Sequence, residues 1–239
     1  SRHICIIAYY LTCIFMLICF DVWSGMRIIT LVTQKGGTGK STLATSLAVA
    51  AKDDGENVLA LDLDPQGTLT AWAHLRGEGA PAVAHLPAQQ TASLPQVLEN
   101  AANTYSLVII DTAGTDNPAT HNAMAVADLC LVPLRPTRPD GLAIKPTVEA
   151  LIRGKQPFAF VLSQCPTTAR NTRASEMAAG LSSIGYLAEP LICSRADYQD
   201  AFSAGQGVTE YAPAGKAASE IRRLWTWINS GAILKESAA

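Results

Sequence analysis

The sequence predicts an α/β fold, a mostly parallel twisted sheet with helices on both faces. Short continuous runs of β-branched and other apolar residues recur along the chain, which is typical of strands buried on both faces of a parallel sheet. Stretches with apolar residues at helical spacing separate these runs, as crossover connections between parallel strands require. Ligands bind such sheets beyond the carboxyl ends of the strands.

The predicted elements follow one another in a regular order. Strands are expected at residues 28–33, 58–63, 107–110, 129–132 and 158–162. The first helix is expected at residues 41–52, which are rich in Ala and Leu, and Gly55 closes it. Further helices are expected near residues 94–102, 118–127, 142–153, 174–184 and 216–228. In the last of these, Leu224, Trp225 and Ile228 are expected to face the core.

The composition narrows the class of protein. The 239 residues include 18 Lys and Arg against 20 Asp and Glu, a net charge of −2, and 49% are hydrophobic. This is enough apolar material for a sizeable core, and it excludes both disorder and a histone-like polycation. Any contact with nucleic acid must therefore come from a local patch. No two of the six cysteines are spaced as CxxC, so the pattern indicates neither a zinc site nor a disulfide framework.

A glycine-rich loop directly follows the first predicted strand and opens the first helix. It reads KGGTGKST over residues 35–42, with glycines at 36, 37 and 39. Such a loop turns successive backbone N–H groups inward, and the positive end of the following helix points to the same place, so an anion is expected there. Lys40 would reach the β- and γ-phosphates of a nucleotide, and the Ser41 hydroxyl would ligate Mg²⁺.

Acidic residues stand at the ends of two predicted buried strands. Asp62 and Asp64 end the second strand at an i, i+2 spacing that places both side chains on one face. Asp111 ends the third strand, in LVIID. Carboxylates at the mouth of an apolar strand are costly unless a cation or an activated water compensates them. For Asp111, capping of the next helix is the alternative.

The loop departs from an ordinary phosphate-binding loop, because Gln34 stands where the first glycine would be and Lys35 is an added lysine. In this it resembles the deviant Walker A box of the ParA/MinD group of P-loop ATPases. The resemblance implies a P-loop NTPase fold and nucleotide contacts from Gly36, Gly37, Thr38, Gly39, Lys40, Ser41 and Thr42. It also implies that Lys35 reaches, in an ATP-bound homodimer, to the phosphates of the other subunit. Taken alone, outside this context, Lys35 is more readily interpreted as a solvated loop lysine.

The same resemblance assigns roles to the carboxylates. The segment from Asp62 to Gln66 resembles the ParA-type DxDPQ motif, in which the second Asp orients the attacking water and the first supports the metal and the switch region. Asp64 is thus the expected hydrolytic residue and Asp62 its neighbour. Asp111 is similar to the Walker B residue that holds Mg²⁺ through a water.

The resemblance also implies base contacts and DNA contacts. In the family, residues after two successive strands flank the adenine, which here would be Pro133 and Gln164, and a purely structural loop is an equal alternative. Family members bind DNA non-specifically through arginines in this half of the chain. Arg170, Arg173 and Arg195 are the candidates, although scattered arginines are usually solvated or paired.

Residues 1–25 differ from the rest of the chain because residues 4–20 are almost wholly apolar. A signal peptide, a membrane anchor and a chain that begins upstream of its natural start at Met26 all fit this segment. We expect the third, since export would separate the nucleotide site from ATP. The expected organisation is a hydrophobic extension over residues 1–25, outside the native fold, and a single ATPase domain over residues 26–239.

The resemblance, which spans residues 26–228, is greatest to the short ParA (ParF-like) partition ATPases. It implies a cytoplasmic, nucleoid-associated enzyme that dimerises on Mg²⁺-ATP, binds DNA non-specifically and hydrolyses ATP slowly until a centromere-binding ParB/ParG-like adaptor stimulates it. A membrane-associated MinD-like positioning ATPase anchored by residues 1–25 is the alternative. The tail at residues 230–239 has one lysine, which disfavours a basic membrane-targeting helix. A scaffold that uses nucleotide only for shape is a third reading.

Overall fold

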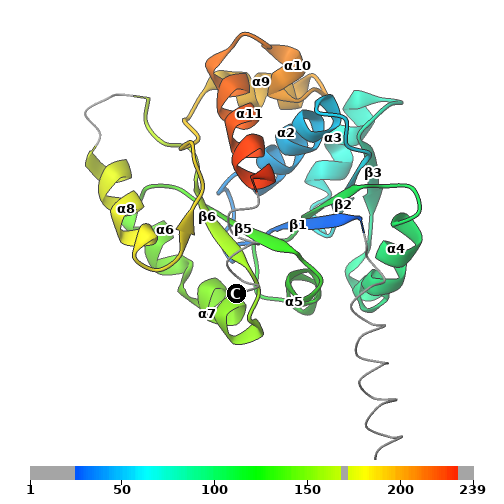
Figure 1. Cartoon of the computed structure of the whole chain (residues 1–239), viewed down its shortest axis with the longest axis horizontal. Helices are drawn as coiled ribbons and strands as arrows, with labels where there is room; N and C mark the ends of the chain where they lie inside the picture. Colours follow the sequence, from blue (N-terminus) through cyan, green and yellow to red (C-terminus); the bar gives the residue numbers. More distant parts are fainter. Residues whose placement is uncertain (1–24, 168–171, 231–239) are drawn as a thin grey trace, which may run out of the picture.

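The computed structural model describes residues 25–167 and 172–230 (Figure 1). In these residues the chain forms a seven-stranded sheet with the strand order β3-β2-β4-β1-β5-β6-β7. Every pair of neighbouring strands in this sheet is parallel. The predicted α/β architecture is therefore confirmed, and β1, which leads into the glycine-rich loop, lies at the centre of the sheet.

Five of the strands occupy the predicted places: β1 (Arg27–Leu31), β2 (Val58–Asp62), β4 (Leu107–Asp111), β5 (Leu129–Leu134) and β6 (Phe158–Leu162). Two edge strands were not predicted, namely β3 (Ala82–His85) and β7 (Tyr186–Leu187). Both are short and partly exposed, so neither has the continuous apolar run by which buried strands are recognised.

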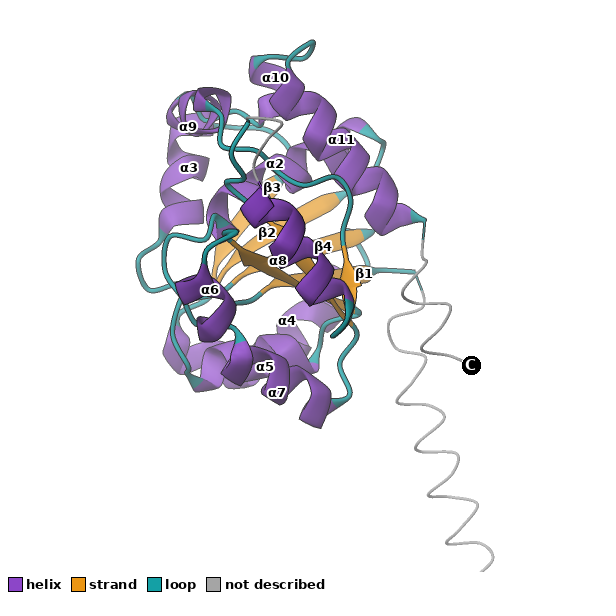
Figure 2. Cartoon of the chain, turned by 90° about the vertical axis from the view of Figure 1, so that its left-hand side faces the viewer, coloured by secondary structure: helices purple, strands orange, loops and turns teal. Residues whose placement is uncertain are grey.

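Helices cover both faces of the sheet (Figures 1 and 2). One face carries α2 (Lys40–Asp53), α3 (Thr68–Arg76), α9 (Ala196–Ser203), α10 (Val208–Tyr211) and α11 (Lys216–Asn229). The other carries the 3₁₀-helix η1 (Ala88–Ser93), α4 (Leu94–Ala101), α5 (Pro118–Ala125) and α7 (Lys145–Gly154). Near the β7 edge lie α6 (Arg138–Ala143) and α8 (Thr172–Ser182).

Alternate residues of the central strands enter cores on opposite faces. In β1, Ile29 and Leu31 pack against the helices on the α2 side, whereas Ile28 packs toward α4. Because both faces are covered, neither can be polar, and this is why the strands read as continuous apolar runs. As expected, Leu224 and Ile228 of α11 are buried in the α2-side core, and so is Trp225.

The helical region after β5 differs from the prediction, which had one helix over residues 142–153. The structure has α6 and α7, which meet at Ile144. The earlier start follows from a cap, because the Thr137 hydroxyl accepts a hydrogen bond from the Asp140 N–H at 3.3 Å. The break follows from Pro146 in the first turn of α7, since proline has no N–H to continue the preceding helix.

In the described ranges, no helix has both the length and the apolar character needed to span a membrane. Residues 1–24, which make up nearly all of the predicted hydrophobic extension, lie outside the described part of the chain.

Candidate functional site: the phosphate loop and its carboxylates

The glycine-rich loop joins the carboxyl end of β1 to the amino end of α2, as predicted. Gly37 and Gly39 have φ angles of 73° and 92°, in the left-handed region that glycine adopts without strain. The backbone N–H groups of residues 35–42 form no hydrogen bond to any described residue, and Leu43 is the first whose N–H bonds back, to Gly39. A row of unpaired N–H groups at a helix N-terminus is an anion-binding arrangement.

The segment after β4 packs directly on this loop. A Cβ atom on Gly114 would lie 2.9 Å from the backbone nitrogen of Gly36, so no other residue fits there without moving the loop. The Thr112 hydroxyl holds the same segment by donating a 2.8 Å hydrogen bond to the Leu31 carbonyl. The end of β4 and the phosphate loop are therefore one packed unit.

Lys40 lies inside the loop and is only 6% exposed. Its Nζ donates a 3.4 Å hydrogen bond to the carbonyl of Lys35. Burial lowers the pKa of Lys40, and the nearby carboxylates of Asp111 and Asp64 oppose that shift. The ammonium group therefore lies between the loop and the acidic residues. A phosphate group bound in the loop could accept a hydrogen bond from it.

Asp111 is a fully buried carboxylate of this site. It is 0% exposed, and neither of its oxygens has a hydrogen-bond partner among the described residues. Burial raises its pKa to about 7, the Ser41 hydroxyl beside it opposes the shift, and the charge of Asp62 adds to it. A buried carboxylate without a partner is costly, and a cation is the compensation that the structure suggests.

The donor set fits Mg²⁺, which takes oxygen ligands and keeps several waters. The Asp111 carboxylate and the Ser41 hydroxyl, which lie together, would hold it. No group of three or more metal-ligating side chains occurs within the described residues, so phosphate and water oxygens would have to complete the coordination shell.

Asp62 lies at the end of β2, but its oxygens are already engaged. Its Oδ1 accepts the Asp64 N–H at 3.0 Å, and its Oδ2 accepts both the N–H and the hydroxyl of Thr70 at 2.8 Å. These bonds make Asp62 an anchor for the turn that leads into α3. Its position favours the predicted support of this turn and does not favour direct metal ligation. Thr70 was missed because nothing in its local sequence marks it.

Asp64 lies just beyond the strand and is partly exposed. Its Oδ1 accepts the Gln66 N–H at 2.9 Å, and no described residue donates a hydrogen bond to its other oxygen. Asp64 is close enough to Lys40 and Asp111 to influence the pKa of both. The prediction that Asp64 belongs to the same site as the loop therefore agrees with its position.

Lys35 is paired within its own chain. Its ammonium group contacts the carboxylate of Asp140, which is 1% exposed at its side chain. Arg135 donates to the same carboxylate from Nε at 2.7 Å, from Nη2 at 3.1 Å and from its backbone N at 3.2 Å. Burial favours the neutral acid, but the hydrogen bonds from Arg135 and Lys35 outweigh it and hold the pKa of Asp140 well below its usual range. Asp140 was not among the predicted site residues.

The residues that follow β6 brace the loop from the other side. The Ser163 hydroxyl donates to the Thr38 carbonyl at 2.7 Å, and the Gln164 side-chain amide donates to the Gly37 carbonyl at 2.9 Å. A hollow of about 140 Å³ opens beside them. It is lined by Gly39, Thr42, Leu43, Ser163, Gln164, Ile192, Cys193, Ser194, Arg195, Tyr198 and Gln199. Gln164 thus lies next to the loop and lines this hollow, and its predicted contact with the adenine stays a prediction.

Pro133 is not at the predicted place. It lies buried inside β5, which runs to Leu134 and not to the expected residue 132, and it does not line the hollow beside the loop. The N–H groups of a strand alternate between its two neighbours, and the Cys130 N–H donates toward β6. An N–H at position 133 would therefore point toward β1, and proline is tolerated because β1 no longer pairs there. The pairing of β5 with β1 ends at Leu131. A base contact from Pro133 therefore has no support in the structure.

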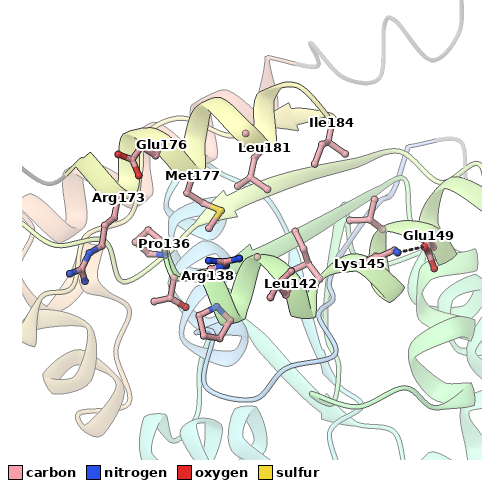
Figure 3. A pocket seen from close by; sticks show the side chains of 16 residues that line it. Pro136, Arg138, Leu142, Lys145, Glu149, Arg173, Glu176, Met177, Leu181 and Ile184 are labelled. Atoms are coloured by element: carbon pink, nitrogen blue, oxygen red, sulfur yellow. Dashed lines mark ion pairs between the residues drawn. The ribbon is translucent and has the colours of Figure 1, made fainter.

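The three candidate DNA-binding arginines lie in different surroundings. Arg170 is outside the described residues. Arg195, at the start of α9, turns inward to a buried carboxylate on Glu220, with Nε and Oε1 2.9 Å apart. Arg173 is exposed on α8 and lines a separate cavity of about 950 Å³ between α6, α7 and α8 (Figure 3). Arg195 is therefore part of the nucleotide-side hollow and not of an open basic patch.

That larger cavity is mainly apolar. Figure 3 shows Leu142 on one wall, and Met177 and Leu181 of α8 and Ile184 of the turn after it on the facing wall. None of the phosphate-loop residues lines it. It is therefore distinct from the site that the loop and carboxylates form.

A central strand that feeds a glycine loop, a lysine inside that loop and a buried aspartate on the adjacent strand together define a P-loop nucleotide-binding fold. Comparison with known proteins identifies the family. The model of the CobQ/CobB/MinD/ParA nucleotide binding domain matches residues 29–206. The chain belongs to this family.

Curated relatives include proteins named for partition. Protein ParA of Rhizobium radiobacter is 28% identical over 187 residues, which cover 75% of this chain and 84% of that protein. The chromosome-partitioning ATPase Soj of Thermus thermophilus is 34% identical over 137 residues, which cover 46% of this chain and 55% of Soj.

Solved structures share the fold at low sequence identity. The cell division ATPase MinD of Pyrococcus furiosus matches with a TM-score of 0.68 at 22% identity, over 86% of this chain and 99% of that one. The ATP complex of a Cyanothece McdA variant matches with a TM-score of 0.69 at 14% identity, over 87% and 97% of the two chains.

Proposed function

We propose that this protein is a partition ATPase that binds Mg²⁺-ATP at the loop of residues 35–42 and hydrolyses it slowly. The observation that carries the proposal is the buried, unpartnered carboxylate of Asp111 beside Lys40 and Ser41. An anion cradle alone would accept many phosphates. A cradle with an uncompensated carboxylate at its edge calls for an anion and a cation together, as Mg²⁺-ATP supplies.

Each group of the site has a separate task in this proposal. The N–H groups of residues 36–42 and the Lys40 ammonium bind the phosphates, with Ser41 and Asp111 holding Mg²⁺. The ion would neutralise the charge on the β- and γ-phosphates. Asp64 orients the attacking water through the oxygen that Gln66 leaves free. The base and ribose lie in the hollow between Gln164 and Arg195.

Isothermal titration calorimetry with Mg²⁺-ATP tests the proposal. Lys40→Ala is expected to weaken binding roughly 10- to 100-fold or more, because a charge-assisted hydrogen bond to phosphate is lost. Asp64→Ala is expected to bind as the wild type does and to hydrolyse ATP at least about 100-fold more slowly in single turnover. A wild-type protein that gives no heat with Mg²⁺-ATP contradicts the proposal, and an Asp64→Ala variant with normal hydrolysis removes that residue from its role.

Partition is the cellular role we propose, because Protein ParA and Soj are relatives of this chain. In this role ATP produces a homodimer in which Lys35 leaves Asp140 and reaches the phosphates of the second subunit. The dimer binds DNA without sequence preference, through Arg173 among others, and a centromere-binding adaptor stimulates hydrolysis. A net charge of −2 makes such DNA binding weak and sensitive to salt.

A mobility-shift titration on plain duplex DNA, with ATP, ADP or no nucleotide at two salt concentrations, tests this role. We expect a shift with ATP alone that weakens at the higher salt concentration. Arg173→Ala should reduce it, and Lys155→Ala, which removes a cation from the turn after α7, is the matched control. A shift that is independent of nucleotide contradicts the proposed cycle.

A positioning ATPase that works on a membrane is the second candidate. The chain shares its fold with the cell division ATPase MinD of Pyrococcus furiosus, and the almost wholly apolar residues 4–20 would supply the anchor. Sedimentation with anionic liposomes, by the full chain and by a chain that starts at Met26, separates the two. ATP-dependent co-sedimentation of the full chain alone would favour the membrane role.

A further inference from the structure

Glu220 forms a polar cluster that the phosphate loop does not explain. It lies on α11, it is 8% exposed, and its carboxylate accepts hydrogen bonds from three residues of one short segment. Oε2 accepts from the Cys193 N–H at 3.1 Å and from the Tyr198 hydroxyl at 3.2 Å. Oε1 accepts from both Nε and Nη2 of Arg195.

The segment that Glu220 holds is one wall of the hollow beside the phosphate loop. Cys193, Arg195 and Tyr198 all line that hollow, opposite Gly39 and Thr42 of the loop and the first turn of α2. Glu220 itself does not line it. The carboxylate therefore acts on the hollow through the residues that it binds.

The same helix is also fixed to the far end of α2. Nε1 of Trp225 donates to the Asp54 carboxylate at 2.9 Å, and the side-chain amide of Asn229 donates to the same oxygen at 3.3 Å. Asp54 directly follows α2, whose first turn belongs to the phosphate loop. Through α11, the wall at residues 193–198 is thus held at a fixed distance from the helix that carries the phosphate site.

The ion pair between Arg195 and Glu220 is the charged part of the attachment between the 193–198 wall and α11. Arg195 is largely buried, with its side chain 20% exposed, and the carboxylate of Glu220 is its partner. Without the carboxylate, the guanidinium group and the Tyr198 hydroxyl would each lose a partner while largely buried, which favours movement of the segment toward solvent. Such a movement would open the hollow and leave the phosphate loop, which is held by Ser163 and Gln164, in place.

We propose that Glu220 is a positioning residue for the base and ribose of the bound nucleotide, because it fixes the 193–198 wall against the phosphate-loop helix. This inference rests on the proposed nucleotide-binding function. It separates two parts of the binding energy: the loop binds the phosphates, and the wall that Glu220 holds binds the nucleoside.

Paired calorimetric titrations with Mg²⁺-ATP and with magnesium inorganic tripolyphosphate test the proposal, because tripolyphosphate has no nucleoside. In Glu220→Ala we expect the affinity for ATP to fall at least about tenfold, the loss typical of a hydrogen bond to a charged group. The affinity for tripolyphosphate should stay unchanged. Glu220→Gln keeps one acceptor oxygen and should show an intermediate preference for ATP.

Glu210→Ala is the matched control. Glu210 on α10 is a similar partly buried carboxylate, and it accepts hydrogen bonds from both Nη atoms of Arg76 at 2.8 Å and from the Gly207 N–H at 3.2 Å. It has no contact with the hollow beside the loop. This variant should lose thermal stability and keep the wild-type ratio of the two affinities.

The outcomes are distinct. A Glu220→Ala variant that keeps the wild-type preference for ATP overturns the inference alone, and so does an equal loss of preference in Glu210→Ala. A wild-type protein that binds neither ligand contradicts the proposed function as well. If Glu220→Ala does not fold, Glu220→Gln decides, and a wild-type preference for ATP in that variant overturns the inference.

Discussion

Asp111 and Asp140 are two buried aspartates that lie at or beyond the carboxyl ends of β4 and β5, and they differ in how their charges are compensated. The carboxylate of Asp111 has no hydrogen-bond partner among the described residues, and burial raises its pKa to about 7. The carboxylate of Asp140 accepts hydrogen bonds from Arg135 and Lys35, which hold its pKa below the usual range despite burial. An uncompensated charge marks a place where a ligand is required, whereas a compensated one holds structure together.

The largest effect is expected from Asp111→Asn, which removes the uncompensated charge with little change of shape. The proposed Mg²⁺ ligand is lost, so ATP hydrolysis should fall at least about 100-fold. The free energy of unfolding of the nucleotide-free protein should not decrease, because the cost of burying a carboxylate that accepts no hydrogen bond exceeds its attraction to Lys40. Single-turnover hydrolysis and urea unfolding measure the two effects. A variant that is markedly less stable would show that Asp111 has a partner in solution.

The opposite result is expected from Asp140→Ala. Removal of this carboxylate leaves Arg135 and Lys35 without a partner and should lower the free energy of unfolding by roughly 2–3 kcal/mol. This is below the loss typical of fully buried pairs because the side chains of Arg135 and Lys35 are 34% and 28% exposed. Urea unfolding at neutral pH measures it, and a loss below 0.5 kcal/mol would contradict the compensated state of Asp140.

The pH dependence of stability tests separately whether Asp140 is ionised and held by Arg135 and Lys35. A carboxyl whose pKa is lowered by folding stabilises the protein above the unfolded-chain pKa, about 3.9 for Asp. This contribution is lost as the pH falls toward the lower folded value. The difference in unfolding free energy between wild type and Asp140→Asn should therefore be constant from about pH 7 to about pH 5 and shrink below about pH 4.

The smallest change in stability is expected from Lys35→Ala. Lys35 is partly exposed, and Asp140 keeps all its bonds to Arg135, so the loss should stay below about 1 kcal/mol. If the proposed role across a dimer is right, hydrolysis should nevertheless fall strongly while ATP binding to the monomer persists. Sedimentation with ATP measures dimer formation, and a steady-state assay measures ATP hydrolysis. Normal hydrolysis by Lys35→Ala would contradict the proposed role across the dimer and leave Lys35 only its ion pair with Asp140.

The sequence predicted what depends on local pattern. The strands β1, β2, β4, β5 and β6 have continuous apolar runs, and the loop at residues 35–42 has its glycines where the chain must turn. The region of α3, β3 and η1 was missed because residues 68–93 have no comparable run and no strong helical spacing. The start of α6 had a local signal that was overlooked, in Thr137 followed by Pro139 and Asp140.

What the sequence did not predict depends on contacts between distant residues. Asp140 meets Lys35 across 105 positions of the chain, and Glu220 meets Arg195 across 25. Arg195 looked like a surface cation because its partner lies on another helix. Pro133 was placed in a loop because proline usually ends a strand, and only the pairing of β5 shows why this strand accepts it.

The attachment of α11 both to the 193–198 wall and to Asp54 at the end of α2 has a consequence for biosynthesis. The phosphate loop is translated early, whereas Glu220 and Trp225 are among the last residues of the described fold to leave the ribosome. A nascent chain can therefore complete its phosphate cradle once Ser163 and Gln164 have emerged, before α11 fixes the 193–198 wall. If the proposed role of Glu220 is right, the preference for a nucleotide over tripolyphosphate is acquired only after α11 has joined the fold.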